Sequence, residues 1–181
     1  MRLSRNEFDS RADRPVLLLW VKPTLGVGNL GLSGWLYCKF LKRKLQGQVA
    51  IQGVDYNCFT SIFSLFWRGS NTGAQRMMEM VEAAVKRRPN QKVFLCGYSQ
   101  GALVIRKALA QLQPETCDQI SGIILMGDPA TLVSPCQKNL NAATRFTISG
   151  YSTTVCTGAF LSLPRRTFGI PWSLIPRLPT S

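Results

Sequence analysis

Short, continuously apolar segments alternate with longer amphipathic ones over most of the chain, and this order constrains the fold more than any other feature. The apolar segments are too short for buried helices and read as strands: residues 15–20 (PVLLLW), 48–54 (QVAIQGV), 92–96 (KVFLC) and 122–126 (GIILM). Helical periodicity follows the first three of them, over residues 32–45, 70–88 and 100–112. Such alternation predicts an α/β fold, a three-layer α/β/α sandwich around a mostly parallel sheet. Residues 145–149 are a candidate for a further strand.

Two of the helices have faces that can be assigned from the pattern. In residues 32–45 we expect Leu32, Trp35, Leu36 and Phe40 to form the apolar face, with Lys39, Lys42, Arg43 and Lys44 toward water. The helix after Ser70 or Asn71, either of which can cap it, should pack through a stripe of apolar residues: Met77, Met80, Val81, Ala84 and Val85.

Composition narrows the chemistry. The 181 residues are 45% apolar and 17% charged, which indicates one folded domain rather than disorder. The chain contains no histidine, which excludes a Ser-His-Asp triad, a Cys-His dyad and imidazole metal sites. Six cysteines are present, and no two form a C-x-x-C pair, so we expect neither a metal nor a cofactor. They could form three disulfides or remain buried thiols, and Cys96 is expected to be a buried small apolar residue.

Three regions are expected along the chain. Residues 1–14 are polar, carry seven charged side chains and read as a loose arm without a secretory signal. Residues 15–158 form the α/β domain, and residues 159–181 are a proline-rich, irregular tail. No carboxylate follows Asp128. No apolar run approaches the roughly 18 residues that a membrane span requires.

Gly97-Tyr98-Ser99-Gln100-Gly101 is a G-x-S-x-G motif placed directly between a predicted strand and a predicted helix. A sharp turn there needs small residues around the serine because the backbone is crowded, and it presents the serine above the positive end of a helix. This context favours a nucleophilic serine with an oxyanion site. The alternative is an ordinary tight turn between strand and helix.

Together with other segments, this motif resembles the cutinase family of secreted α/β-hydrolases. The resemblance covers about residues 16–158 and rests on GYSQG and four further segments: Gly28-Asn29-Leu30-Gly31, residues 51–56, residues 69–73 and Gly127-Asp128-Pro129. It implies Ser99 as the nucleophile. It also implies an oxyanion hole from the backbone N–H of Gln100 and from Thr24. The resemblance further implies esters such as cutin, acylglycerols or acetylated polysaccharide as binding partners. It also implies that the protein is extracellular, and we expect a monomer.

The resemblance fails at the other two members of the triad. The family's acid aligns with Thr153, and its histidine aligns with Arg166, which cannot accept the serine proton. Two family cysteines are also replaced, at Arg88 and near Ser149. Asp128 or a desolvated Lys22 could replace the base. For Asp128 we favour a turn or cap role. The resemblance aligns Lys22 with a basic residue of the family's first loop, and a lysine is a poor base unless it is desolvated.

These observations leave three hypotheses. The first is a cutinase-like serine esterase that is impaired. The second is an inactive relative, or the product of a truncated gene, that binds an ester, lipid or polymer. The third is a basic module for nucleic acid or an acidic surface, suggested by the net charge of +13. We favour solvated helix faces for the charges, which lie in separate short groups at residues 42–44, 86–88, 106–107 and 165–166. Phe59, Phe63, Phe66 and Trp67 could line an acyl groove, although packing is commoner.

Overall fold

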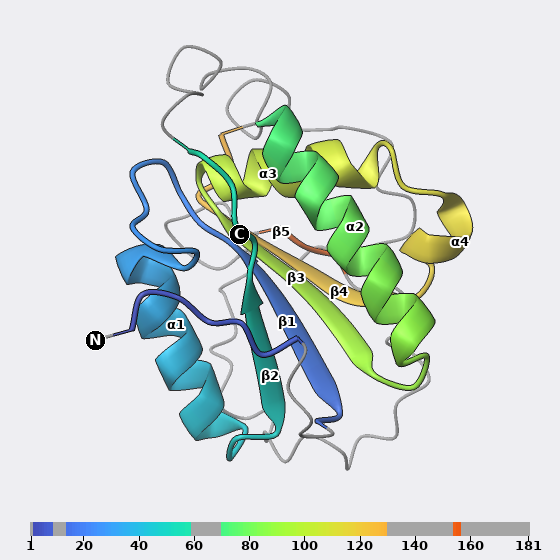
Figure 1. Ribbon diagram of the computed structural model, residues 1–181, viewed down its shortest axis with the longest axis horizontal. Helices are drawn as coiled ribbons and strands as arrows, with labels where there is room; N and C mark the ends of the chain where they lie inside the picture. The colour runs from blue at the N-terminus through green and yellow to red at the C-terminus, as the bar shows by residue number, and fades with distance from the viewer. Residues whose placement is uncertain (1, 9–13, 59–69, 130–153, 157–181) are drawn as a thin grey trace, which may run out of the picture.

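Five strands form one sheet in the order β2-β1-β3-β4-β5, as Figure 1 shows. The computed structural model describes residues 2–8, 14–58, 70–129 and 154–156. Neighbouring strands from β2 to β4 run parallel, and β5 is antiparallel to β4. The elements are β1 (Val16–Val21), α1 (Gly31–Lys44), β2 (Val49–Gly53), α2 (Asn71–Arg87), β3 (Lys92–Tyr98), α3 (Gln100–Leu109), α4 (Pro114–Cys117), β4 (Ile120–Met126) and β5 (Thr154–Cys156). The predicted α/β fold with a mostly parallel sheet is confirmed.

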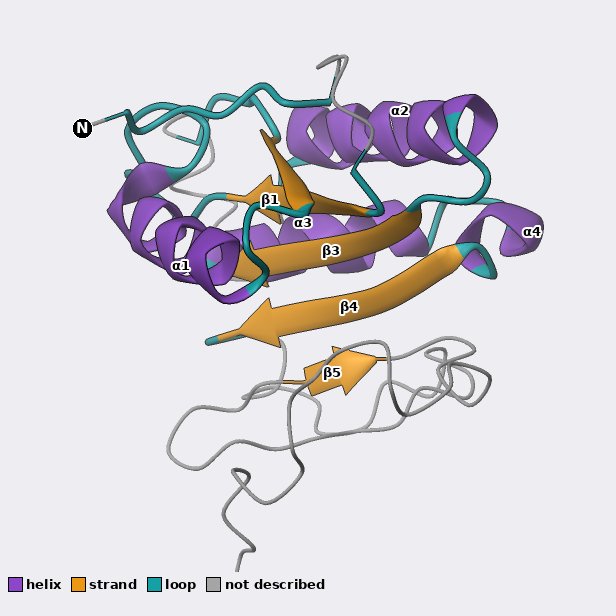
Figure 2. Cartoon of the chain, turned by 90° about the horizontal axis from the view of Figure 1, so that it is seen from below, coloured by secondary structure: helices purple, strands orange, loops and turns teal. Residues whose placement is uncertain are grey.

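Alternate residues of β1 face the two sides of the sheet, because side chains alternate along a strand. Leu17, Leu19 and Val21 lie in the cluster that contains α2 and α3. Leu18 and Trp20 lie in the cluster on the α1 side. Both sets are buried, which explains the continuously apolar sequence of this strand. Figure 2 shows the resulting layers, with α1 on one side of the strands and α3 on the other.

The α2 and α3 layer follows the sequence prediction. Met77, Val81 and Ala84 are buried on the sheet side of α2, and Met80 and Val85 pack beside them. The Ser70 hydroxyl caps this helix by accepting a hydrogen bond from the Gly73 N–H at 3.1 Å. Helices thus cover both faces of the sheet, and α2 turns an apolar face toward the sheet and a polar face toward solvent.

The face predicted for α1 is wrong. Its buried residues are Gly31, Gly34 and Cys38, whereas three apolar side chains point to solvent: Leu32, Leu36 and Phe40, which are 59%, 54% and 58% exposed. A side chain on Gly34 would collide with the Trp20 indole. The helix therefore approaches the sheet through its small residues, because Trp20 already fills the space between the two.

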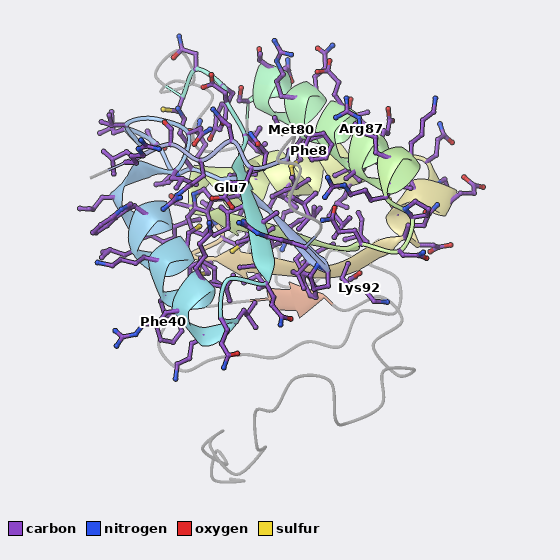
Figure 3. All side chains as sticks on the ribbon, turned by 60° about the horizontal axis from the view of Figure 1, so that its bottom comes forward. Glu7, Phe8, Phe40, Met80, Arg87 and Lys92 are labelled. Atoms are coloured by element: carbon purple, nitrogen blue, oxygen red, sulfur yellow. The ribbon has the colours of Figure 1, made fainter. Side chains whose placement is uncertain are left out.

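Residues 3–8 are not a loose arm. They run along β2, the edge strand, with an antiparallel bridge between Asn6 and Gln52. The Glu7 N–H donates to the Ile51 carbonyl at 3.1 Å. The Glu7 carboxylate lies on the α1 side, where it accepts hydrogen bonds from Lys42 and Arg14. Phe8 packs on the opposite side beside Met80 and Arg87, as the labelled side chains in Figure 3 show. The arm thus covers a sheet edge that would otherwise expose unpaired backbone groups.

Several predictions concern residues outside those that the structure describes, including the strand at residues 145–149, the aromatic residues Phe59 to Trp67 and the tail. The structure adds two elements that the sequence did not indicate, α4 and β5.

The buried state predicted for Cys96 is confirmed, and burial raises the pKa of its thiol well above the ordinary value. Cys38 and Cys58 are also buried and free. Across the described residues, no helix has the length and hydropathy of a membrane span.

Candidate active site

Ser99 lies in a strained turn between β3 and α3. Its φ and ψ angles are 53° and −116°, in a region that residues with a side chain rarely adopt. Gly97 and Gly101 make the turn possible: a side chain on Gly97 would lie 2.6 Å from the Gly101 carbonyl, and one on Gly101 would collide with the Val21 carbonyl. Small residues are therefore required on both sides of the serine, as predicted, because backbone atoms leave no room for a side chain.

The turn is fixed from the neighbouring strand and opens directly into α3. The Ser99 N–H donates to the Met126 carbonyl of β4 at 2.9 Å. Gln100 is the first residue of the helix, where backbone N–H groups have no acceptor within the helix. The positive end of the α3 dipole lies at the same point. The arrangement can therefore stabilise negative charge that develops next to the Ser99 side chain.

Thr24 and Gln100, the two residues expected to form an oxyanion hole, are brought together from positions far apart in the sequence. The Thr24 hydroxyl donates to the Gln100 Oε1 atom at 3.4 Å. The Gln100 side chain is buried, and its Nε2 atom has no hydrogen-bond partner among the described residues. This contact ties the loop after β1 to the first residue of α3.

The loop between β1 and α1 is held by hydrogen bonds of Trp20, Lys22 and Asn29. Trp20 Nε1 donates to the Leu30 carbonyl at 2.8 Å, and Lys22 Nζ donates to the Gly28 carbonyl at 2.7 Å. Asn29 is buried and exchanges hydrogen bonds with the backbone of Arg5. Gly28 has a φ of 68°, and a side chain there would collide with the Leu3 carbonyl. These contacts fix the part of the loop that follows Thr24.

Lys22 is buried, with 6% of its surface exposed. Its ammonium group lies over the Tyr56 ring, 5.5 Å from the centroid. The Tyr56 hydroxyl in turn donates to the Lys22 carbonyl at 2.8 Å, and burial raises the pKa of this phenol. The sequence signal that could have revealed this is the apolar strand directly before Lys22. The ammonium group stabilises the loop, since it donates to the Gly28 carbonyl.

Asp128 follows β4 and is fully buried, with its carboxylate 2.5 Å from Nε of Arg106 on α3. The turn or cap role favoured from the sequence did not anticipate this ion pair. Arg106 was likewise expected on a solvated helix face, but its side chain is only 16% exposed. The contact joins α3 to the end of the sheet and occupies the carboxylate with a cation.

The remaining parts of the expected triad are not placed. Thr153 and Arg166, which align with the family's acid and histidine, lie outside the described residues, as do Arg165 and Ser149. Within the part of the chain that the structure describes, no group of three or more metal-ligating side chains is found. The site as described therefore consists of a strained serine, a helix amino terminus and a rigid loop that carries Thr24.

Comparison with known proteins agrees with this geometry. The family model for cutinase matches residues 14–162. The chain is 28% identical over 165 residues to a cutinase of Monilinia fructicola, covering 91% of this chain and 81% of that protein. It is 34% identical over 116 residues to cutinase pbc1 of Pyrenopeziza brassicae, covering 63% of this chain and 56% of that protein.

Among solved structures, the fold resembles the Trichoderma reesei cutinase in complex with a C11Y4 phosphonate inhibitor, with a TM-score of 0.54 and 28% identity. That alignment covers 64% of this chain and 52% of the other. The chain thus spans less than two thirds of the length of several relatives that it matches. Because the family model covers most of the chain and the strained serine lies where the motif requires it, this protein belongs to the cutinase family.

Proposed function

We propose that this chain is a serine esterase of the cutinase type whose turnover is impaired, with Ser99 as its nucleophile. The observation that carries the proposal is the positive φ of Ser99 at the start of α3. A strained backbone at that point has a cost, and such strain is found where a side chain must be presented for reaction. An ordinary turn between a strand and a helix has no need of it.

Each residue has a distinct role in the proposed reaction. Ser99 Oγ attacks the carbonyl carbon of a carboxylic ester, and the carbonyl π electrons move to the oxygen. The backbone N–H groups of Gln100 and Thr24 donate hydrogen bonds to that oxyanion, while the Thr24 hydroxyl holds the Gln100 side chain. Collapse of the intermediate expels the alcohol and leaves an acyl-serine, which water hydrolyses. Family membership supports esters of the cutin, acylglycerol or acetylated polysaccharide class as substrates.

The weak point is the proton of the Ser99 hydroxyl. The chain has no imidazole to accept it. Neither replacement considered above is available: Arg106 holds the Asp128 carboxylate, and Lys22 donates to the Gly28 carbonyl. We therefore assign the proton to solvent. Triad enzymes that lack a member retain on the order of 10³–10⁴-fold catalysis over water, from the oxyanion hole and binding.

A second function is favoured by a specific observation, the absence of histidine together with Thr153 and Arg166 at the family's acid and base positions. In this case the chain is an inactive relative that binds an ester, lipid or polymer with its intact serine loop. Under either function, we propose residues 15–158 as the domain that carries the site, between the arm 1–14 and the tail 159–181. Family membership supports an extracellular location, and we propose a monomer.

The test is hydrolysis of p-nitrophenyl butyrate by the full chain beside the Ser99→Ala variant. A rate clearly above that of Ser99→Ala supports the esterase. A fluorophosphonate probe, which reacts with nucleophilic serines, separates the two functions independently of turnover. Labelling of the wild type but not of Ser99→Ala supports a reactive serine. Equal rates and no labelling, with both proteins folded by circular dichroism, contradict the esterase and leave the binding function.

A further inference from the structure

Exposed apolar side chains are concentrated in one segment of the molecule. Among the residues that the structure describes, five large apolar side chains are more than half exposed, and all lie between residues 25 and 40: Leu25, Val27, Leu32, Leu36 and Phe40. The last three are spaced four apart and form a stripe along the outer side of α1, where Figure 3 labels Phe40. We call these five residues the outer stripe. Solvent alone gives no reason for such a concentration.

Cations flank the outer stripe, and some of them rest on aromatic rings. Lys39 Nζ lies 5.1 Å from the centroid of the Trp35 ring, and Lys44 Nζ lies 5.6 Å from that of Phe40. Arg43 is exposed beside them. The helix contains no Asp or Glu, and among the described residues only Lys42 of its four cations pairs with a carboxylate, that of Glu7. A helix face that combines apolar side chains with Lys and Arg can rest on a membrane surface, because the long cationic side chains reach the headgroups while the apolar ones enter the acyl boundary.

Charge decides which occupant fits this surface. Residues 129–181 contain no carboxylate and carry five cations, so packing them on α1 would bring like charges together: Lys138, Arg145, Arg165, Arg166 and Arg177. A second copy of α1 would do the same. An anionic bilayer complements both features, because its headgroups attract the cations and its acyl boundary accepts the apolar side chains.

The outer stripe also has a defined relation to Ser99. Leu25 and Val27 belong to the loop that follows β1, and Val21 at the end of β1 pairs with Gly97 of β3. The outer stripe therefore begins near the carboxyl ends of the parallel strands, where the strained serine also lies, and extends along α1 from there.

We propose that the outer stripe and the cations of α1 dock this protein on an anionic lipid surface. Lys39 and Lys44 reach the headgroups while Leu36 and Phe40 enter the acyl boundary. The proposal does not depend on the chemistry of Ser99, since it concerns binding and would hold for an inactive relative.

The test measures co-sedimentation of the full chain with vesicles of about three parts phosphatidylcholine to one part phosphatidylserine, and with phosphatidylcholine alone. We expect binding at least about tenfold stronger to the anionic vesicles. The variant Lys39→Gln/Lys44→Gln should bind roughly 25-fold more weakly, because each cation near such a surface contributes about fivefold. Leu36→Ser/Phe40→Ser should also lose at least about tenfold. Since all four side chains lie on the outer side of the helix, these variants should remain folded.

The matched control is Lys86→Gln/Lys92→Gln, which removes the same charge from exposed positions on α2 and β3. We expect it to bind within about twofold of the wild type. An equal loss in this control, or full binding by Leu36→Ser/Phe40→Ser, would overturn the proposal in favour of a general polycation. The absence of binding at low salt would overturn it as well.

Two further measurements address the other occupants. Without vesicles, a thiol introduced by Leu36→Cys should react with maleimide as fast as one introduced by Gln75→Cys on α2. Slow labelling at position 36 would mean that the chain itself covers the stripe. Sedimentation equilibrium should give a monomer. A dimer that is lost in Leu36→Ser/Phe40→Ser would mean that a second copy covers it, and either result contradicts docking on lipid.

Discussion

On each side of the sheet a helix packs closely against β1 through a glycine, but the two glycines face different atoms. On one side Gly101 of α3 faces the backbone carbonyl of Val21, and on the other Gly34 of α1 faces the indole of Trp20. A carbonyl in the middle of a sheet is fixed by its neighbours, whereas the Trp20 ring, although buried and hydrogen-bonded to the Leu30 carbonyl, can shift slightly. The α3 layer is therefore seated rigidly, at the position where the Ser99 turn needs it. The α1 layer rests on an adaptable contact and turns its apolar residues outward.

The ion pairs of the two layers differ in the same way. Asp128 and Arg106 join the α3 layer to the sheet with a carboxylate that has no exposed surface. Glu7 and Lys42 join the α1 layer to the arm, and both side chains keep some contact with water. The layer that contains the serine turn is therefore held more tightly against the sheet than the α1 layer.

The largest expected effect comes from Gly101→Ala. Its new methyl group would meet the Val21 carbonyl, so we expect the free energy of unfolding to fall by about 3 kcal/mol or more, at the upper end for overpacking. Gly34→Ala is the matched control, because it adds the same methyl group and the same helix propensity on the other side. Here the new methyl group meets the Trp20 side chain rather than the backbone, so a small shift of the buried ring, which lengthens its hydrogen bond to the Leu30 carbonyl, should limit the loss to about 1–2 kcal/mol.

Urea denaturation of both variants measures this difference. A loss in Gly34→Ala as large as that in Gly101→Ala would show that Trp20 is held as rigidly as the backbone. The contrast between the two layers would then be wrong.

A smaller effect is expected from Arg106→Met, which removes the guanidinium from the buried Asp128 carboxylate. Breaking a buried pair from one side costs about 3–5 kcal/mol, and the partial exposure of Arg106 should reduce the loss to about 2–3 kcal/mol. Lys42→Met is the control on the other layer, where we expect a loss under about 1 kcal/mol. Adding Asp128→Asn to Arg106→Met should restore part of the stability, as measured in a double-mutant cycle. No recovery would mean that Arg106 acts through packing alone.

The smallest effect concerns pH and the Glu7 carboxylate. Burial acts to raise its pKa, but hydrogen bonds from Lys42 and the Ile51 N–H, with the charges of Lys42 and Arg14, lower it below the ordinary 4.5. A depressed pKa in the folded state adds stability above the unfolded pKa, and this stability is lost as the pH falls through the folded value. We expect Glu7→Gln to be less stable at pH 7 and to lose less stability than the wild type below about pH 4.5. Identical pH profiles in thermal denaturation would contradict this role.

Much of the fold could be predicted because a buried strand is recognisable from its short, continuously apolar sequence. Continuously apolar strands such as Val16–Val21 can only lie in a sheet covered on both faces. The strand, the G-x-S-x-G motif and the helix that follows likewise predicted the position of the Ser99 turn. The face of α1 could not be predicted from periodicity, because Gly34 and Cys38 give no apolar signal and yet face the sheet.

The site shows the same division between local and distant causes. Ser99 and Gln100 are adjacent in sequence, so their relation could be inferred from the motif. The burial of Lys22 depends on Tyr56 and Gly28, and that of Asp128 on Arg106, 22 residues away. Such partners are selected by where the sheet places them, which the spacing along the chain does not reveal.

Three features could be inferred from the sequence without the structure: the layers of the sheet, the position of the Ser99 turn and the lack of an imidazole base. These features follow from local chemistry, because apolar segments must be buried and a crowded turn requires glycine. Histidine is the side chain whose unperturbed pKa lies near neutral pH, so a chain without it lacks the usual general base. The pairing of Asp128 with Arg106, the hydrogen bond from Lys22 to the Gly28 carbonyl and the outward direction of Leu36 and Phe40 on α1 are visible in the three-dimensional structure alone. Those outcomes depend on which atoms compete for the same space and the same hydrogen bonds once distant segments meet.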